Sequence, residues 1–112
     1  MPFDGLPEGL VSDMVKLRIA LEGVRDGGWI TARVGLTESE PHCAIGWLLV
    51  ATDWNRDEAT RLALEYVYPA LPEKARKRAR LSSIWTYNDA GGHKRIVRLF
   101  EDAVRLAEQA VH

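Results

Sequence analysis

The chain has 112 residues and a formal net charge of −1 at pH 7, so we expect one domain built around one hydrophobic core. Its 46% hydrophobic and 28% charged residues are ordinary for a globular protein and exclude a disordered chain. The near-neutral charge gives no overall attraction to nucleic acid or to an anionic membrane, and the single cysteine cannot form an internal disulfide.

Residues 1–7 are expected to be an irregular lead-in, because prolines and a glycine interrupt any regular pattern there, and residues 8–112 a single helical domain. The N-terminus lacks the basic start and apolar run of a secretory signal. The longest uncharged apolar run, residues 43–52, is about half the length that crosses a bilayer. We therefore expect a cytoplasmic protein without a membrane partner.

The first helix is predicted from Glu8 onward, where apolar side chains recur at alternating steps of four and three residues. Gly27 and Gly28 are expected to end it, because glycine accepts the left-handed backbone of a helix C-terminus. Asp13 falls off the apolar face. That face consists of Leu10, Met14, Leu17, Leu21 and Val24.

The next segment leaves two interpretations open. Residues 29–36 alternate apolar and polar side chains, which is typical of a short strand or extended segment. Residues 43–51 are apolar on every side and suit a buried helix or a buried strand, although their alanine and leucine content favours the helix. If they form a strand, residues 29–36 and 43–50 can pair as a short β-hairpin.

A further helix is predicted behind Asn55 and Glu58, which have the spacing of a capping box. In such a box Asn55 accepts a hydrogen bond from a new helix amide, and Glu58 reaches back. Pro69 is expected to end this helix. Its apolar stripe consists of Ala59, Leu62, Ala63, Tyr66 and Val67.

Pro72 suits the first position of another helix, which is expected to run through the basic residues toward Trp85. Residues 88–92 are predicted to be a loop, and a last helix follows. The sequence therefore predicts a mostly α fold of four to five helices around one core. The apolar face of the last helix consists of Ile96, Leu99, Phe100, Ala103, Ala107 and Ala110.

The charge is unevenly distributed, since residues 1–72 carry a net −5 and residues 73–112 a net +4. Five of the eight residues from Glu73 to Arg80 are Lys or Arg. One alternative is a nucleic-acid-binding domain that uses the basic segment 74–98, with Trp85 or Tyr87 stacking on a base. Helical periodicity spreads these cations around the helix, which favours a solvated face or a docking site for the acidic part of a partner.

Cys43 is a candidate nucleophile, because a cysteine that opens a helix has its thiolate favoured by the helix dipole. His42, His93 and His112 are the available bases, and the enzyme alternative pairs Cys43 with His93. The opposing interpretation, a small buried hydrophobe in an apolar run, is the more common role of a free cysteine. His42, Cys43 and His93 form no paired ligand motif, so neither a metal nor a cofactor is expected.

The four tryptophans and the segment from Trp85 to His93 supply the candidate binding residues. Most tryptophans are expected to fill the core, while a ligand pocket is the sharper interpretation. Asn88 and Asp89 are typical of turns and helix caps. We expect a binding site where these segments converge, formed by Trp29, Cys43, Trp85, Asn88, Asp89 and His93.

Three short motifs span most of the chain: Gly28-Trp29, Cys43-Ala-Ile-Gly46, and the segment from Trp85 through Asn88-Asp89 to Gly92. In these motifs the sequence resembles a group of small uncharacterised bacterial and phage-associated proteins, a domain of unknown function. The chain departs from that pattern at Trp47, where the group carries a small residue. The resemblance implies a mostly helical single domain and no particular activity.

The leading hypothesis is a small cytoplasmic helical binding or adaptor module that recognises a protein or a small molecule in preference to nucleic acid. It depends on the incomplete catalytic constellation, the tryptophan content and the separated acidic and basic segments. The two alternatives are the Cys43–His93 enzyme and the nucleic-acid-binding domain.

Overall fold

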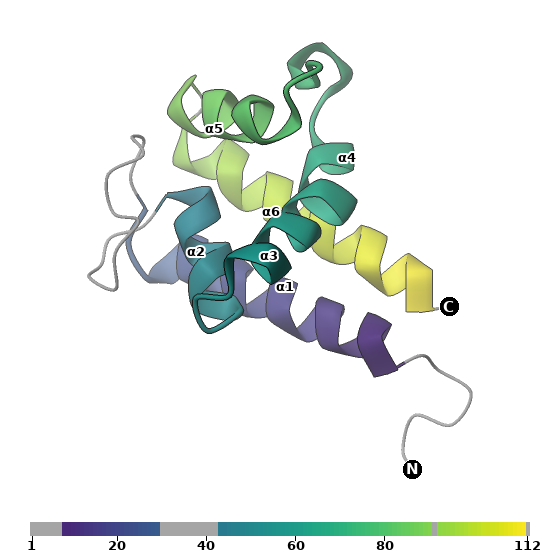
Figure 1. The fold of residues 1–112 in the computed structure, drawn as a ribbon. Coiled ribbons are helices and arrows are strands. Elements are labelled where there is room, and N and C mark those ends of the chain that lie inside the picture. The colour runs from purple at the N-terminus through teal and green to yellow at the C-terminus, as the bar shows by residue number, and fades with distance from the viewer. Residues whose placement is uncertain (1–7, 30–42, 91, 112) are drawn as a thin grey trace.

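The computed structural model describes residues 8–29, 43–90 and 92–111. Within these ranges the chain forms five helical segments, which confirms the predicted mostly α fold (Figure 1). No described helix is both long enough and apolar enough to cross a membrane. The segments are α1 (Glu8–Asp26), α2 (Ala44–Ala51), an unbroken rod of α3 (Arg56–Leu62), the π-helical turn η1 (Ala63–Val67) and α4 (Tyr68–Ala70), α5 (Arg80–Ala90), and α6 (His93–Val111).

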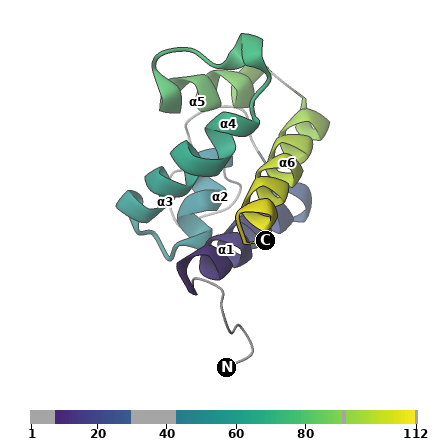
Figure 2. The same ribbon diagram turned by 90° about the vertical axis from the view of Figure 1, so that its right-hand side faces the viewer.

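The two longest helices, α1 and α6, pack side by side and carry much of the core. Helix α2 packs on α1, and the rod packs against α2 and α6. Helix α5 lies at one end of the molecule, next to α4 and the start of α6 (Figures 1 and 2). Because α5 forms the edge of the described bundle, parts of both its flanks are left uncovered by the other described helices.

Helix α1 confirms the predicted first helix and its end. Leu17 and Val24 are fully buried, and Met14 and Leu21 pack partly buried against the core. Gly28, just beyond the helix, has a φ of 101°, a backbone conformation that favours glycine. Asp13 is buried as well, although the pattern placed it off the apolar face.

Residues 44–51 form a helix, so the β-hairpin that pairs residues 29–36 with 43–50 is wrong. Residues 30–42, which would supply most of its first strand, lie outside the described residues. The cap of α2 comes from another part of the chain: Cys43 makes no side-chain cap, and the Ala44 amide donates to Asn88 Oδ1 of α5 over 3.1 Å. A partner 44 residues away leaves no local sign in the sequence.

Helix α2 approaches α1 closely because Trp47 lies against two glycines. A Cβ atom on Gly23 or Gly27 would overlap the Trp47 ring. The Trp47 indole donates to the Gly28 carbonyl oxygen over 2.9 Å, just beyond the end of α1. The glycines therefore have a packing role besides ending the helix.

The rod confirms the predicted apolar stripe, because all five residues of the stripe are buried. Asn55 Oδ1 accepts from the Glu58 amide over 3.0 Å, but the Glu58 carboxylate binds Arg61 and Lys16, so only half of the predicted capping box forms. The rod ends at Ala70, one residue after Pro69. A proline ring displaces the carbonyl four residues earlier, and that carbonyl belongs to the wide π turn η1.

The predicted helix from Pro72 toward Trp85 is wrong over its first half. Pro72 precedes a single 3₁₀ turn, η2 (Glu73–Ala75), and residues 76–79 are not helical. A continuous helix would place like charges on successive turns, which destabilises it.

The predicted loop at residues 88–92 is also too long, since α5 continues to Ala90 and Asn88 is buried within it. In α6, Ala110 is exposed and the other predicted apolar positions are buried.

The contact of Trp47 with α1 predicts opposite effects at two glycines of that helix. Gly23→Ala should lower the free energy of unfolding by about 1–3 kcal/mol, because overpacking against the ring outweighs the better helix propensity of alanine. Gly9→Ala, where nothing lies within 4 Å of the new Cβ, should leave stability unchanged or raise it by up to about 1 kcal/mol. Urea unfolding measures both. Equal stabilisation by the two alanines would contradict the packing described.

Candidate functional site

Positive charge without a partner gathers at one place in the described structure. Most cations elsewhere are in ion pairs, namely Lys16, Arg18, Arg25, Arg61, Arg98 and Arg105. Around η2, α5 and the start of α6 the described residues show no ion pair for any cation. These cations are Lys74, Arg76, Lys77, Arg78, Arg80, Lys94 and Arg95.

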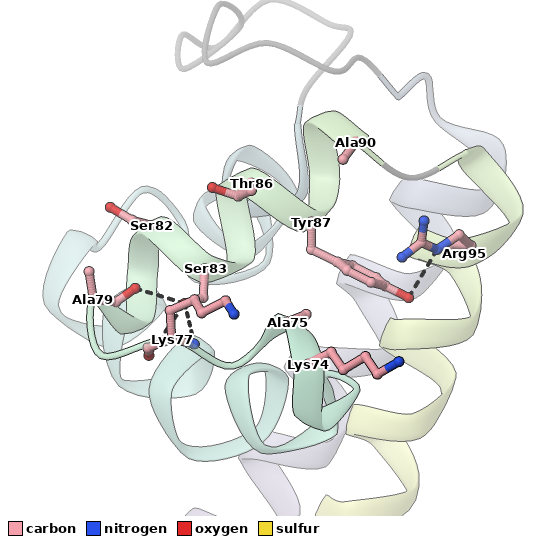
Figure 3. Close-up of a pocket in the computed structure, with 10 residues that line it drawn as sticks. All are labelled: Lys74, Ala75, Lys77, Ala79, Ser82, Ser83, Thr86, Tyr87, Ala90 and Arg95. Atoms are coloured by element: carbon pink, nitrogen blue, oxygen red, sulfur yellow. Dashed lines mark hydrogen bonds between the residues drawn. The ribbon is translucent and has the colours of Figure 1, made fainter.

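Some of these cations line a pocket of about 360 Å³ between α5, the segment from η2 to Ala79, and the start of α6 (Figure 3). We call it the basic pocket. No carboxylate of the described residues lines it, and the polar side chains among them are ammonium, guanidinium and hydroxyl groups. Its lining consists of Lys74, Ala75, Lys77, Ala79, Ser82, Ser83, Thr86, Tyr87, Ala90 and Arg95.

Three of the donors point to the same side of the basic pocket. Figure 3 shows the ends of the Lys74, Tyr87 and Arg95 side chains directed there from η2, α5 and α6. The Arg95 Cζ atom lies 4.4 Å from the centre of the Tyr87 ring, and Arg95 Nε donates to Tyr87 Oη over 3.3 Å. The ring thus holds the guanidinium in place by a cation–π contact.

The non-helical stretch that precedes α5 is held in place by hydrogen bonds to the amide and to the carbonyl oxygen of Lys77. The Lys77 amide donates to Ser83 Oγ over 2.9 Å, and the Tyr68 hydroxyl donates to the Lys77 carbonyl oxygen over 2.7 Å. The Ser83 hydroxyl donates to the Ala79 carbonyl oxygen over 2.9 Å. The backbone that carries the basic residues therefore has a defined position before any ligand arrives.

The basic pocket can hold an anionic group, since ammonium, guanidinium and hydroxyl donors all bind carboxylate or phosphate oxygens. Its cations fall within the segment 74–98 of the nucleic-acid alternative. The hydroxyl residues Ser82, Ser83 and Thr86 were missed by the sequence reasoning. Their signal is a spacing of three and four residues, which places hydroxyls on one face of α5.

Several of the predicted site residues meet at a different place, where α1, α2, α5 and α6 join. Asn88 has no exposed surface, and its Oδ1 accepts from Trp29 Nε1 over 2.7 Å and from the Ala44 amide. The rings of Trp29 and His93 stack with centroids 5.4 Å apart. Asp89 is exposed and accepts from Asn88 Nδ2. None of these residues lines the basic pocket.

The chemistry available to Cys43 and His93 is limited by their contacts. Cys43 is 0% exposed, so its sulfur has no access to solvent. His93 Nε2 lies 2.6 Å from the Val24 carbonyl oxygen, which only accepts, so this nitrogen carries a proton and donates it. Within the described residues, no group of His, Cys, Asp and Glu side chains is arranged to hold a metal ion.

Trp85 lies apart from this cluster, in an apolar pocket of about 180 Å³ on the other side of α5. We call it the apolar pocket. It opens between α2, α3 and α5, and one arginine lies among otherwise uncharged side chains. Its lining consists of Ile45, Leu49, Arg56, Ala59, Thr60, Leu81 and Trp85.

A charged network around the buried Asp13, between α1 and the rod, was also missed. Arg61 donates to both oxygens of Asp13, over 3.0 and 2.5 Å, and also to Glu58 and Glu65. The Tyr66 hydroxyl donates to Asp13 Oδ2 over 2.8 Å. These partners satisfy one another and line neither the basic nor the apolar pocket, so we interpret the network as structural.

The same contacts shift the pKa values of three side chains in the network. Hydrogen bonds to Asp13 and Glu58 raise the pKa of Arg61 above its usual value. The hydrogen bond from Arg61 lowers the pKa of Glu58, against the opposing effect of burial. Burial, together with the hydrogen bond to Asp13, raises the pKa of Tyr66 to about 12.

No family model, curated protein or solved structure matches this chain. The resemblance to small bacterial and phage-associated helical proteins therefore stays a prediction. Its motif residue Asn88 does accept hydrogen bonds from Trp29 and Ala44 of the other two motifs.

Because the Asn88 carboxamide is buried and hydrogen-bonded, we expect Asn88→Ala to cause a large loss of stability. Two buried donors, Trp29 Nε1 and the Ala44 amide, lose an acceptor, which should lower the free energy of unfolding by about 2–3 kcal/mol. Thr86→Ala, an exposed position two residues earlier on α5, should change it by less than about 0.5 kcal/mol. Chemical unfolding monitored by tryptophan fluorescence checks this, and similar losses in both variants would contradict the assigned role.

The raised pKa of Tyr66 predicts a loss of stability in alkaline solution. The folded state keeps the phenol proton more tightly than the unfolded state, so this contribution is complete below pH 10 and is lost as the pH rises toward 12. Two pKa units correspond to about 2–3 kcal/mol. Tyr66→Phe should remove this part of the pH dependence and Tyr68→Phe should keep it, as measured by unfolding between pH 9 and 12. Identical profiles for wild type and Tyr66→Phe would contradict the assignment.

Proposed function

We propose that the protein is a binding module that recognises an acidic segment of a partner protein at the basic pocket. The observation that carries this proposal is a group of cations around a pocket, for which the described part of the chain shows neither an ion pair nor a carboxylate in the pocket lining. Cations that face one another without counter-charges repel, which costs stability. An acidic partner supplies the missing charge and relieves that repulsion.

The nucleic-acid alternative has less support from the aromatic side chains. Stacking on a base needs an open ring face, but the Tyr87 ring is half-buried and carries Arg95 at 4.4 Å. Trp85 lies in the apolar pocket, away from the basic one. Residues 1–72 carry a net −5, so a long polyanion that extends beyond the basic pocket meets repulsion, whereas a short acidic segment does not.

The enzyme alternative also has less support. It requires Cys43 to reach a substrate and His93 to accept a proton. The sulfur is buried, and His93 Nε2 is committed to the Val24 carbonyl oxygen, which leaves Nδ1 alone to accept a proton. The binding module needs neither group to react, and it uses the exposed residues of the pocket as they stand.

Binding to a fluorescent peptide of eight glutamates tests the proposal by fluorescence anisotropy. The wild type should bind it, and the affinity should fall as salt is added, because exposed charges are screened. The triple variant Lys74→Gln, Lys77→Gln, Arg95→Gln should weaken binding at least about tenfold, since charge-assisted hydrogen bonds are worth roughly 1.5–3 kcal/mol each.

A charge-matched control separates this site from the total charge of the protein. The variant Arg18→Gln, Arg25→Gln, Arg105→Gln loses the same three charges at positions outside the basic pocket and should keep most of the affinity. Equal losses in both triple variants, or no binding by the wild type at low salt, would overturn the proposal. Tighter binding of a thymidine octanucleotide than of the peptide, lost in the pocket variant, would replace it with the nucleic-acid alternative.

A further inference from the structure

The apolar pocket and the basic pocket lie on two sides of the same helix. Leu81 and Trp85 of α5 face the apolar pocket, whereas Ser83 and Tyr87 face the basic pocket. Neither pocket is filled by any described side chain. An apolar cavity of roughly 150 Å³ takes up a molecule the size of benzene, so the apolar pocket, at about 180 Å³, has room for one apolar side chain.

A third hollow, around the first turn of α5, shares lining residues with both pockets, and we call it the connecting hollow. It is lined by Leu64, Ala79, Arg80, Leu81 and Ser82. Ala79 and Ser82 also line the basic pocket, and Leu81 also lines the apolar pocket. A chain that leaves one pocket can therefore pass over Ser82 and Leu81 and enter the other without leaving the surface.

We propose that one extended segment of the partner protein occupies both pockets, with acidic residues in the basic pocket and a single apolar side chain in the apolar pocket. This inference rests on the proposed function, because the acidic part is the same. The charge along the path supports the choice of occupant: Arg80 lines the connecting hollow and Arg56 lines the apolar pocket, and the described residues show no ion pair for either. An apolar anchor flanked by acidic residues complements both arginines.

The geometry of the helix also sets the spacing in the partner. An α-helix with its side chains is about 10–12 Å across. An extended chain advances about 3.3 Å per residue, so about three to five residues suffice to cross the helix. The apolar anchor should therefore lie about three to five residues from the acidic group.

Labelled peptides that differ only in the anchor test the inference. One peptide carries four glutamates, a four-residue Gly/Ser spacer and a leucine, and its control has serine in place of the leucine. The wild type should bind the leucine peptide at least about tenfold more tightly, the gain from burying one such side chain. Shortening the spacer to one residue should remove most of this gain.

Filling the apolar pocket should remove the gain and leave the binding of the glutamates. Thr60→Phe places a ring in the pocket, and Thr60→Val keeps its shape as the matched control. Thr60→Phe should bind both peptides equally, at the affinity that the wild type shows for the serine peptide. Circular dichroism confirms that each variant is folded.

A second measurement keeps the test independent of the fold of Thr60→Phe. A peptide with 4-iodophenylalanine as its anchor should quench tryptophan fluorescence through the heavy atom, and the quenching should disappear in Trp85→Phe. If wild-type protein binds leucine and serine peptides equally, or quenching persists without Trp85, the inference is wrong while the proposed function stands. If neither peptide binds, the proposed function itself fails.

Discussion

The position of α5 depends on one buried carboxamide. Asn88 Oδ1 accepts from the Trp29 indole beyond the end of α1 and from the first amide of α2, so one oxygen joins three parts of the chain. Helix α5 is at the edge of the bundle and buries few large side chains, with Ile84 the main apolar one. A buried polar group is stable only with its partners in place, so it specifies one arrangement where apolar contacts alone would allow several.

The fixed position of α5 determines which of its side chains line the two pockets and which are exposed. Because Asn88 and Ile84 hold the inner face of α5 against the bundle, its two flanks face the basic and the apolar pockets, and Thr86 and Ser82 remain exposed between them. The position of α5 and the arrangement of the two pockets therefore depend on the same hydrogen bonds at Asn88.

The helices that local periodicity describes well, α1, α6 and the rod, could be predicted from the sequence, because their apolar faces repeat over several turns. The sequence-based predictions are wrong where contacts between residues far apart in the chain determine the local structure. The capping of α2 comes from Asn88, and Asn88 itself, a residue typical of turns, lies within a helix because two distant donors compensate its burial. Of the candidate site, the basic residues were visible as a run, but the Ser83 and Tyr68 contacts that fold this run back on α5 were not.

The uneven charge along the sequence becomes an uneven charge in space because acidic residues of the first half are used internally. Asp13, Glu58 and Glu65 all bind Arg61, so these carboxylates are committed to joining α1 to the rod. They are not available to neutralise the cations near α5. Like charges near one another destabilise the fold, and an acidic ligand would relieve that repulsion. This is the physical reason for proposing the α5 surface as a binding site.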